Sequence, residues 1–572
     1  MFSSKLINFY LIVCIINIGC RDCLNILPKN QHNCSLQVST THGIIQGSEK
    51  ITIKGLPYFA YEGIPFAQPP LGDLRFRSPQ PIKPWTGVLD ATVKGSECVK
   101  VHIPFPDNPT TDGNEDCLYL NVFTPQTKTN KLLPVIFWIY GGAFYEGSSG
   151  DFGPSNLLEN GLVVVTSNYR LGMFGFLSTG DTVLPGNYGL KDQNAALRWT
   201  YHNIIKFGGD PNRITISGQS AGGCSVWYHM LSSKSKGLFS RAISMSGEPR
   251  SVWSYQQNPK AVAMNVAANL GIDVKNFSQL AEYLRKVDIT DLKRANLLVT
   301  SVQIFTALQD GLPFTPTIEV DHDEAFITSS PTEIIRQQKY SKVPILMGMT
   351  TTEAGLYGKI LNLVKRISVV FDISPGSLPN GFKGLSTINS SKVGRRIRDK
   401  YVQSKSFGTV TFEELCNILS DALYTKPIMD AARALSPYTS VYLYINSKPS
   451  FIIKGVLIYL GYPILLNTKG VIHGEDVPII WNYRNFSSPS DTYTIKKVFT
   501  KMWSNFAATG NPTPGNDPVL INITWPPITD NNNIPYLSLG EEIKIKYNYR
   551  KKYIDFWDNL EKEVKYKDML LK

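Results

Sequence analysis

The chain has 572 residues, of which 42% are hydrophobic, and it carries a formal net charge of +12 at pH 7. This length is ample for a large buried core. The charge does not predict a nucleic-acid-binding protein, because the basic residues are scattered and only Lys544–Lys552 is locally dense. No linker, repeat or low-complexity tract divides the sequence, so we expect one large domain with long insertions over residues 23–572.

The N-terminus has the pattern of a signal peptide. Lys5 is followed by an almost entirely apolar run from Leu6 to Ile18, which is too short for the ~20 residues of a membrane-spanning helix. We expect residues 1–22 to be cleaved, with a buried N-terminal helix as the alternative. The C-terminus shows neither a hydrophobic tail nor a retention signal, so we expect a secreted, extracellular protein without a membrane anchor. Sequons predict glycosylation at Asn33, Asn276, Asn389, Asn485 and Asn522.

The cysteines fit an oxidising compartment. Cys98 and Cys117 bracket a loop rich in Pro, Asp and Asn, and we expect them to be joined. Closing a loop of that size contributes roughly 3 kcal/mol in the chain-entropy model. Cys224 and Cys416 lie in apolar surroundings and are predicted to be buried free thiols. The pairing of Cys23, Cys34 and Cys416 stays open.

Several apolar runs lack the alternation of a half-exposed sheet and are typical of strands buried on both faces of a mostly parallel sheet. The predicted strands are 134–139, 162–166, 213–217, 343–347 and 441–445. Helices are predicted over 190–207 and 494–508, with a turn at 208–211 between the first helix and its following strand. The sequence therefore predicts an α/β fold, in which helices flank a large, mostly parallel central sheet.

A reactive serine is predicted where the strand 213–217 ends. Gly218-Gln219-Ser220-Ala221-Gly222 follows this strand and opens an apolar, helical run. A G-x-S-x-G motif between a strand and a helix is a nucleophile elbow, a feature of the α/β-hydrolase fold, and its small residues allow close approach of chain and substrate. The five-residue pattern alone is weak, but in this context it predicts that Ser220 is a catalytic nucleophile.

A serine nucleophile needs a base, normally a histidine held by a carboxylate. The expected chain order of serine, acid and histidine leaves His229, His322 and His473. His229 lies on the helix that leaves the elbow, and His322 stands in an acidic turn. His473 lies in the glycine-bounded loop Gly470–Gly474 and is the predicted base, with an ordinary loop histidine as the alternative.

For the acid, the loop after a central strand is the expected place. Glu353 follows the predicted strand 343–347, whereas Glu319 and Glu333 lie beside prolines with no preceding apolar strand. Glu353 is therefore the predicted acid, with an ordinary surface carboxylate as the alternative.

The oxyanion formed during attack needs backbone N–H donors. Tyr140–Phe144 is a glycine-rich turn just after the strand 134–139. Gly142, Ala143 and the amide of Ala221 are the predicted donors, and a simple tight turn is the alternative. No H-E-x-x-H, paired C-x-x-C, P-loop or G-x-G-x-x-G motif occurs, so we expect no metal and no cofactor.

Beyond these motifs, the chain resembles the type-B carboxylesterase and cholinesterase family over essentially everything after the signal. The matching stretches are Tyr61–Pro70, Leu74–Arg77, Glu115–Asn121, Asn168–Gly172, Gly189–Gln193, Phe207–Pro211 and the elbow.

The resemblance assigns further roles. Family members carry their triad glutamate in a segment like Gly348–Ala354, which supports Glu353, and the resemblance also supports the Cys98–Cys117 bridge. It implies that Ser246 hydrogen-bonds the acid and that Trp253 lines the acyl pocket, as in related insect esterases.

Two departures from the family pattern bear on the substrate. Tyr140 opens the oxyanion loop, as in cholinesterases, where carboxylesterases usually have histidine. Leu89 stands where cholinesterases place the tryptophan that binds a quaternary ammonium, so the cation–π site is missing. In addition, 248–271 contains no cysteine, so the later intrachain disulfide of these families is absent.

These features predict a secreted serine carboxylesterase that hydrolyses uncharged esters through an acyl-serine intermediate, as a monomer or homodimer. A narrower alternative is a juvenile hormone esterase, because Gln219 and the spacing of Gly470, His473 and Asp476 resemble that insect subgroup. A non-catalytic adhesion protein of the same fold is a remote alternative. Such proteins typically lose a triad residue and carry a membrane span, whereas this sequence keeps all three predicted triad residues and shows no such span. The physiological ester cannot be read from the sequence.

Overall fold

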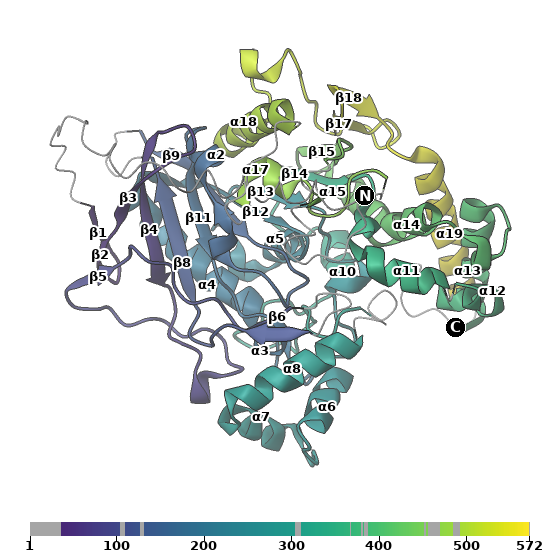
Figure 1. Cartoon of the computed structure of the whole chain (residues 1–572), viewed down its shortest axis with the longest axis horizontal. Helices are drawn as coiled ribbons and strands as arrows, with labels where there is room; N and C mark the ends of the chain where they lie inside the picture. Colours follow the sequence, from purple (N-terminus) through teal and green to yellow (C-terminus); the bar gives the residue numbers. More distant parts are fainter. Residues whose placement is uncertain are drawn as a thin grey trace, which may run out of the picture. The chain divides into compact units, whose positions relative to one another are not determined.

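A large mixed sheet organises the computed structural model, which describes residues 36–102, 109–125, 131–303, 311–366, 368–378, 381, 387–450, 454–455, 469–483 and 492–570. Within these ranges the sheet has 11 strands in the order β18-β17-β15-β14-β13-β12-β9-β11-β8-β4-β3 (Figure 1). In chain order they are β3 (Ser48–Ile51), β4 (Pro57–Pro65), β8 (Tyr119–Thr124), β9 (Leu133–Ile139), β11 (Val163–Ser167), β12 (Gly209–Gln219), β13 (Arg241–Met245), β14 (Ile345–Thr350), β15 (Val441–Asn446), β17 (Pro535–Leu539) and β18 (Ile543–Tyr547).

The centre of this sheet is parallel and its margins are antiparallel. Strands from β11 through β9, β12, β13, β14 and β15 to β17 pair in parallel, and β8, β4, β3 and β18 pair antiparallel. All residues of β11, β14 and β15 are buried, which explains their unbroken apolar sequences. The predicted mostly parallel sheet is therefore confirmed.

Helices pack on this sheet and extend beyond it. Helices α4 and α5 pack against β12, and α18 packs against β9 and β12. The described α-helices are α2 (Ser155–Leu158), α3 (Gly172–Phe176), α4 (Tyr188–Asn203), α5 (Ala221–Leu231), α6 (Pro259–Asn269), α7 (Phe277–Lys286), α8 (Ile289–Gln303), α10 (Pro331–Arg336), α11 (Gly358–Arg366), α12 (Val370–Ile373), α13 (Thr387–Val402), α14 (Phe412–Ser420), α15 (Lys426–Leu435), α17 (Val477–Ile480), α18 (Tyr493–Thr509) and α19 (Lys551–Leu570).

Three smaller sheets complete the described strands. They are β1 (Gln37–Thr40) with β2 (Gly43–Gln46) and β5 (Val88–Asp90); β6 (Lys100–His102) with β7 (Thr110–Asp112); and β10 (Phe152–Gly153) with β16 (Asn482–Tyr483). The β6–β7 hairpin contacts α8, which lies with α6 and α7 in one group of helices (Figure 1). This group is an insertion between β13 and β14.

The predicted elements differ from the observed ones mainly at their ends. The helix predicted over 190–207 is α4 followed by a 3-10 turn, Ile204–Phe207. The predicted turn 208–211 is wrong in part, because only Gly208 has left-handed backbone and β12 already begins at Gly209, where it pairs with β9 before a register shift. The long helix α18 ends, as predicted, at Gly510, whose positive φ of 82° forms a left-handed cap.

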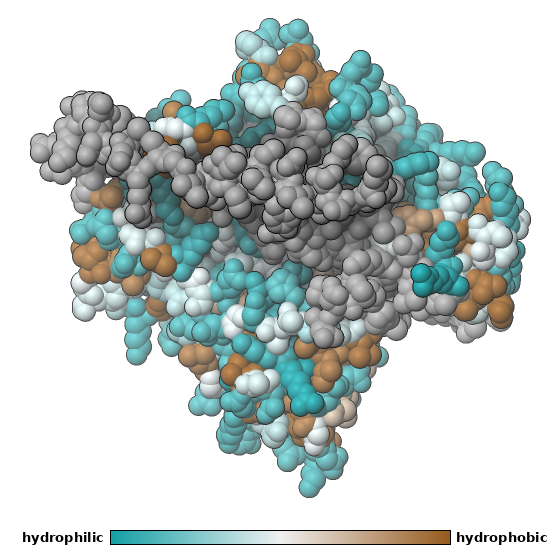
Figure 2. All heavy atoms as spheres, viewed as in Figure 1, coloured by the Kyte–Doolittle hydropathy of each residue, from teal (hydrophilic) through white to brown (hydrophobic). Residues whose placement is uncertain are grey.

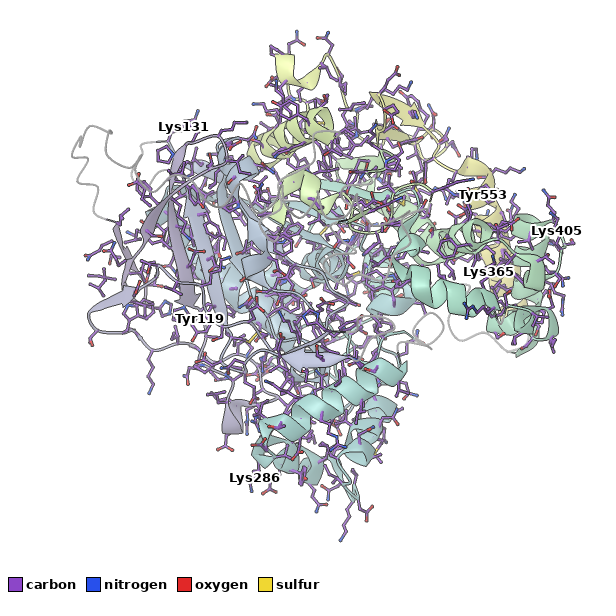
Figure 3. The ribbon with its side chains drawn as sticks, in the orientation of Figure 1. Tyr119, Lys131, Lys286, Lys365, Lys405 and Tyr553 are labelled. Atoms are coloured by element: carbon purple, nitrogen blue, oxygen red, sulfur yellow. A yellow bond between two sulfur atoms is a disulfide. The ribbon has the colours of Figure 1, made fainter. Side chains whose placement is uncertain are left out.

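Basic residues occur on widely separated parts of the surface. Lys131, Lys286 and Lys405 lie far apart in Figure 3. On the face seen in Figure 2, the hydrophobic residues form small separate groups among hydrophilic ones. Residues Gln37–Lys572 group into one compact unit, and the predicted signal peptide 1–22 lies outside the described residues. No helix in the described ranges has both the length and the apolar character that crossing a membrane requires.

Candidate active site

Ser220 stands on a tight turn at the end of β12. Its φ of 59° is unfavourable for a residue with a side chain, and such strain persists only where the surrounding structure fixes it. Its N–H donates to Met245 O at 2.8 Å. A Cβ atom at Gly222 would lie 2.0 Å from Ile139 O, and one at Gly218 would lie 2.4 Å from Gly222 O. The two glycines of the motif are therefore required by the close packing of this turn.

Glu353 and His473 are in direct contact. Glu353 opens a short 3-10 helix, Glu353–Tyr357, just after β14. Its Oε2 lies 2.5 Å from His473 Nδ1, and its Oε1 accepts hydrogen bonds from Ser246 Oγ and Thr350 N, each at 2.7 Å. The carboxylate is buried, so these donors fix its orientation. The structure thus brings three of the predicted site residues together: the acid, the base and Ser246.

The loop that carries His473 also reaches the turn that carries Ser220. Gln219 Nε2 lies 3.1 Å from His473 Nε2, and Gln219 is the chain neighbour of Ser220. Thr352 N donates to Val471 O at 2.8 Å, which ties the loop that carries Glu353 to the loop that carries His473. The elbow and these two loops therefore meet at the carboxyl ends of β12 and β14.

The predicted oxyanion loop lies against Ser220. A Cβ atom at Gly141 would lie 3.0 Å from Ser220 Cβ. Gly142 and Ala143 have positive φ values of 111° and 53°, and their amides donate to no group in the part of the chain that the structure describes. Ala221 is the first residue of α5, where an amide has no partner within the helix. All three amides are therefore available as donors, and Gly141 and Ala221 bring the two segments that carry them next to Ser220.

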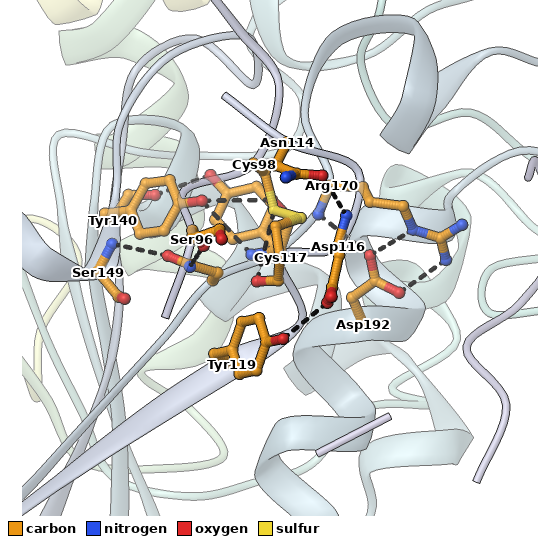
Figure 4. The surroundings of a disulfide bond; sticks show 12 residues. Ser96, Cys98, Asn114, Asp116, Cys117, Tyr119, Tyr140, Ser149, Arg170 and Asp192 are labelled. Carbon is orange, nitrogen blue, oxygen red and sulfur yellow. Dashed lines mark hydrogen bonds and ion pairs between the residues drawn. A yellow bond between two sulfur atoms is a disulfide. The ribbon is translucent and has the colours of Figure 1, made fainter. Parts of the chain in front are cut away.

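Tyr140 supports this loop. Its ring stacks on Tyr169 with 4.5 Å between centroids, and Tyr169 Oη donates to Tyr140 O at 2.9 Å. The expected Cys98–Cys117 disulfide is present beside this pair (Figure 4). Val101 N, in the loop that the disulfide closes, donates to Tyr145 O at 2.9 Å. The bridge is therefore linked to the oxyanion loop through β6.

An aromatic row that the sequence did not reveal leads from Trp253 to the histidine. Tyr424 lies 5.0 Å from the His473 ring and 5.6 Å from the Trp253 ring, between centroids. It lies on a π-helical turn, Asp421–Thr425, a feature frequent at functional sites. Tyr424 Oη and Tyr357 Oη are 2.7 Å apart. Tyr424 therefore connects Trp253 to His473. The sequence around Tyr424 is an apolar run, which gives no sign of this arrangement.

Asp476 is a second buried carboxyl group behind the histidine. Tyr444 Oη donates to its Oδ2 at 2.7 Å, and its Oδ1 has no hydrogen-bond partner in the described ranges. Burial raises the pKa of Asp476 to about 6, and nearby Glu353 adds to the rise, whereas Tyr444 and His473 oppose it. Burial of a carboxyl group in this way favours its protonated form.

This pKa predicts a pH-dependent stability. The folded protein binds the Asp476 proton more tightly than the unfolded chain, whose carboxyl has a pKa near 3.8. The stabilisation is fully present below pH ~4 and is lost as the pH rises through ~6. Asp476→Asn removes this titration, so its unfolding free energy relative to wild type should rise by about 1–3 kcal/mol between pH 4 and pH 8. Urea unfolding at several pH values measures this, and a pH-independent difference would contradict it.

The rejected candidates have other partners. His229 is fully buried between Ser235 and Gln193, and burial lowers its pKa to about 3. Glu319 is buried against Lys191 Nζ at 2.6 Å. The other two groups have different neighbours: His322 is near Glu319, and Glu333 pairs with Arg336 on the exposed face of α10.

The sequons that predict glycosylation differ in their exposure. Asn276 and Asn522 are exposed, whereas the side chain of Asn389 is buried, which disfavours it as a glycan acceptor. Asn33, Asn485, Cys23 and Cys34 lie outside the described residues. Cys224 and Cys416 are free and buried, as predicted. Within the described ranges, no group of three or more His, Cys, Asp or Glu side chains is arranged to hold a metal ion.

Comparisons with known proteins agree with this geometry. Residues 34–557 match the profile of the Carboxylesterase family. A carboxylic ester hydrolase of Bombus ignitus is 35% identical over 93% of this chain and 95% of its own. Venom carboxylesterase-6 of Apis mellifera is 33% identical over 92% and 94%, and a juvenile hormone esterase of Tribolium castaneum is 32% identical over 83% and 84%.

A solved structure is similar over nearly the whole fold. The crystal structure of juvenile hormone esterase from Manduca sexta, with OTFP covalently attached, has a TM-score of 0.79 and 25% identity, and the match covers 92% of this chain and 99% of that chain. The α/β-hydrolase fold is therefore confirmed. Family profile, relatives and fold together show that the chain belongs to the carboxylesterase family and is a serine carboxylic-ester hydrolase.

Proposed function

We propose that the protein is a secreted carboxylesterase that hydrolyses uncharged esters through an acyl-Ser220 intermediate, with His473 as base and Glu353 as acid. The observation that carries the proposal is the 2.5 Å contact between His473 Nδ1 and Glu353 Oε2 beside the elbow. It leaves Nε2 as the ring nitrogen that takes up a proton. The predicted signal peptide supports secretion.

The reaction proceeds in two balanced steps. Ser220 Oγ attacks the ester carbonyl carbon while its proton moves to His473 Nε2, and Glu353 stabilises the resulting imidazolium. The amides of Gly142, Ala143 and Ala221 stabilise the oxyanion. The His473 proton then goes to the leaving alcohol. A water molecule then attacks the acyl carbon and gives a proton to His473. The bond between the acyl carbon and Ser220 Oγ breaks, and His473 returns the proton to Ser220 Oγ, which releases the acid and restores the serine.

Uncharged esters are the expected substrates. Leu89 lies on β5, where it pairs with Ile45, and an aliphatic side chain offers no cation–π site. The nearby Trp85 donates its Nε1–H to Ile44 O and stacks on His42, so it is already engaged. Position 89 therefore offers no aromatic ring that would favour the binding of a quaternary ammonium group.

We therefore expect faster turnover of 1-naphthyl acetate than of acetylthiocholine. A desolvated cation–π contact is worth about 2 kcal/mol, or roughly 30-fold, and its absence removes this advantage of the charged ester. Comparison of kcat/KM for the two esters tests the proposal, with Ser220→Ala as the blank. A clear preference for acetylthiocholine would contradict the substrate assignment, and no hydrolysis of either ester by folded protein would contradict the function.

Juvenile hormone is a second candidate substrate. Gln219, the spacing of Gly470, His473 and Asp476, and the similarity to juvenile hormone esterases of two insects favour it. The other similar relatives are esterases of broader description, so we place a general carboxylesterase first. A kcat/KM for juvenile hormone far above that for 1-naphthyl acetate would reverse this order.

A further inference from the structure

Gln219 makes a contact that the predicted triad does not account for. It is the last residue of β12 and is 7% exposed. Its Nε2 lies 3.1 Å from His473 Nε2. A Cβ atom at Gly141 would lie 2.9 Å from its Oε1, and one at Gly474 would lie 3.7 Å from its Nε2. The amide is therefore held between the oxyanion loop and the histidine loop.

The chemistry of this contact determines the protonation of the ring. A carboxylate only accepts hydrogen bonds, so the 2.5 Å contact with Glu353 places a proton on His473 Nδ1. In the neutral ring Nε2 then carries a lone pair, and only a donor can face it. The amide N–H of Gln219 is such a donor. The contact therefore selects the neutral Nδ1–H form, which is the form that can accept the Ser220 proton.

The other groups around the ring favour the charged form. The Glu353 carboxylate in contact with Nδ1 attracts an imidazolium, and Asp476 does so only where it is ionised, above pH about 6. The Tyr424 ring, 5.0 Å away, presents an aromatic group that also attracts a cation. Of these contacts, Gln219 is the one that favours the neutral ring. It opposes premature protonation without adding a charge.

We infer that Gln219 is a positioning residue, which holds His473 neutral before attack and yields Nε2 to the Ser220 hydroxyl when substrate binds. In the described structure Gln219, and not Ser220, donates to Nε2. Nε2 has one lone pair, so the two donors compete for it. The inference rests on the proposed function, because it assigns a role within the same triad.

Two substitutions at this position separate charge from packing. In Gln219→Glu the carboxylate cannot donate to a lone pair, but it can accept from a protonated Nε2. It therefore stabilises the imidazolium, and an opposite charge at this distance shifts a titration by about one to three units. Gln219→Leu removes the donor without adding a charge. Gln403→Glu makes the same charge change at an exposed position and serves as the control.

The measurement is kcat/KM for 1-naphthyl acetate from pH 5 to pH 9, because its acid limb reports the base in the free enzyme. We expect Gln219→Glu to move the acid limb upward by at least about one unit and to regain activity at high pH. Gln219→Leu should move it much less, and Gln403→Glu should keep the wild-type profile. Equal losses at every pH in both Gln219 variants, without displacement of the limb, would show a merely structural role and overturn the inference.

A second measurement observes the wild-type protein directly and does not depend on how the Gln219 variants fold. With ¹⁵N-labelled histidine, and with His473→Ala to assign the signal, Nδ1 of His473 should appear as an N–H at neutral pH and Nε2 as an unprotonated acceptor. The reverse tautomer, or an imidazolium, would overturn the inference while ester hydrolysis persists. A folded wild type that hydrolyses no ester would instead overturn the proposed function itself.

Discussion

Ser220→Ala and His473→Ala should each lower kcat for 1-naphthyl acetate by about 10⁶-fold, because the residues of such a triad act as a unit. The serine supplies the attacking oxygen and the histidine removes its proton, so neither works without the other. Glu353→Gln should cost less, since the base survives in a poorer orientation. Single-turnover and steady-state kinetics measure these losses.

Non-additivity is the signature of the shared mechanism. The Ser220→Ala/His473→Ala double variant should be no slower than either single variant. Ser278→Ala and His202→Ala change the same residue types at exposed helical positions and should keep wild-type rates. Losses that sum in the double variant would contradict a triad of these residues.

Gly142→Ala should lower kcat by about 10²–10³-fold, the cost of losing one oxyanion donor. A Cβ atom at Gly142 would lie 2.2 Å from Glu146 O, and the φ of 111° is unfavourable for alanine. The loop must therefore shift, and the amides of Gly142 and Ala143 move with it. KM should change less than kcat, since the lost interaction forms in the transition state.

A substitution at a second glycine, Gly161, serves as the control for the effect of backbone strain alone. Gly161 has a φ of 76° but no heavy atom near its Cβ position. Gly161→Ala should reduce stability by roughly 1–3 kcal/mol and leave kcat unchanged. If Gly142→Ala behaves in the same way, with a loss of stability but full kcat, the loop does not provide the oxyanion donors.

Continuous apolar runs made the parallel centre of the sheet predictable. Strands β9, β11, β14 and β15 were located to within a few residues, because burial on both faces excludes polar residues. The antiparallel strands β3, β4 and β8 were not predicted. Strands β3 and β4 are partly exposed, and the pairing of β4 with β8 is interrupted by a shift in register. Their hydrophobic pattern in the sequence is therefore weaker, and their pairing depends on segments that are distant in the chain.

The site was predictable where chemistry demands a motif. Glycines at 218 and 222 follow from the close packing of the elbow, and Glu353 and His473 lie in contact although they are 120 positions apart. Gln219 and Tyr424 were missed as partners of His473. Their contacts with His473 arise only in the folded protein, since a glutamine in a motif and a tyrosine in an apolar run give no sign of what they will face.

The same limit applies to surface properties. A sequon predicts an acceptor from three residues, but burial of Asn389 depends on how α13 packs. By contrast, Asn276 caps α7 through its Oδ1, which accepts from Gln279 N at 2.9 Å, and its side chain is exposed. Local sequence therefore predicts the motif, and tertiary packing determines whether it is accessible.

The most direct test of the central claim is labelling with an organophosphonate probe, followed by mass spectrometry of the modified peptide. An activated serine displaces the leaving group of the probe and keeps the phosphonyl group. We expect wild-type protein to be labelled at Ser220, and Ser220→Ala and His473→Ala not to be labelled. Correctly folded wild-type protein that takes up no probe, or takes it up at another residue, would contradict the assignment of Ser220 as the nucleophile.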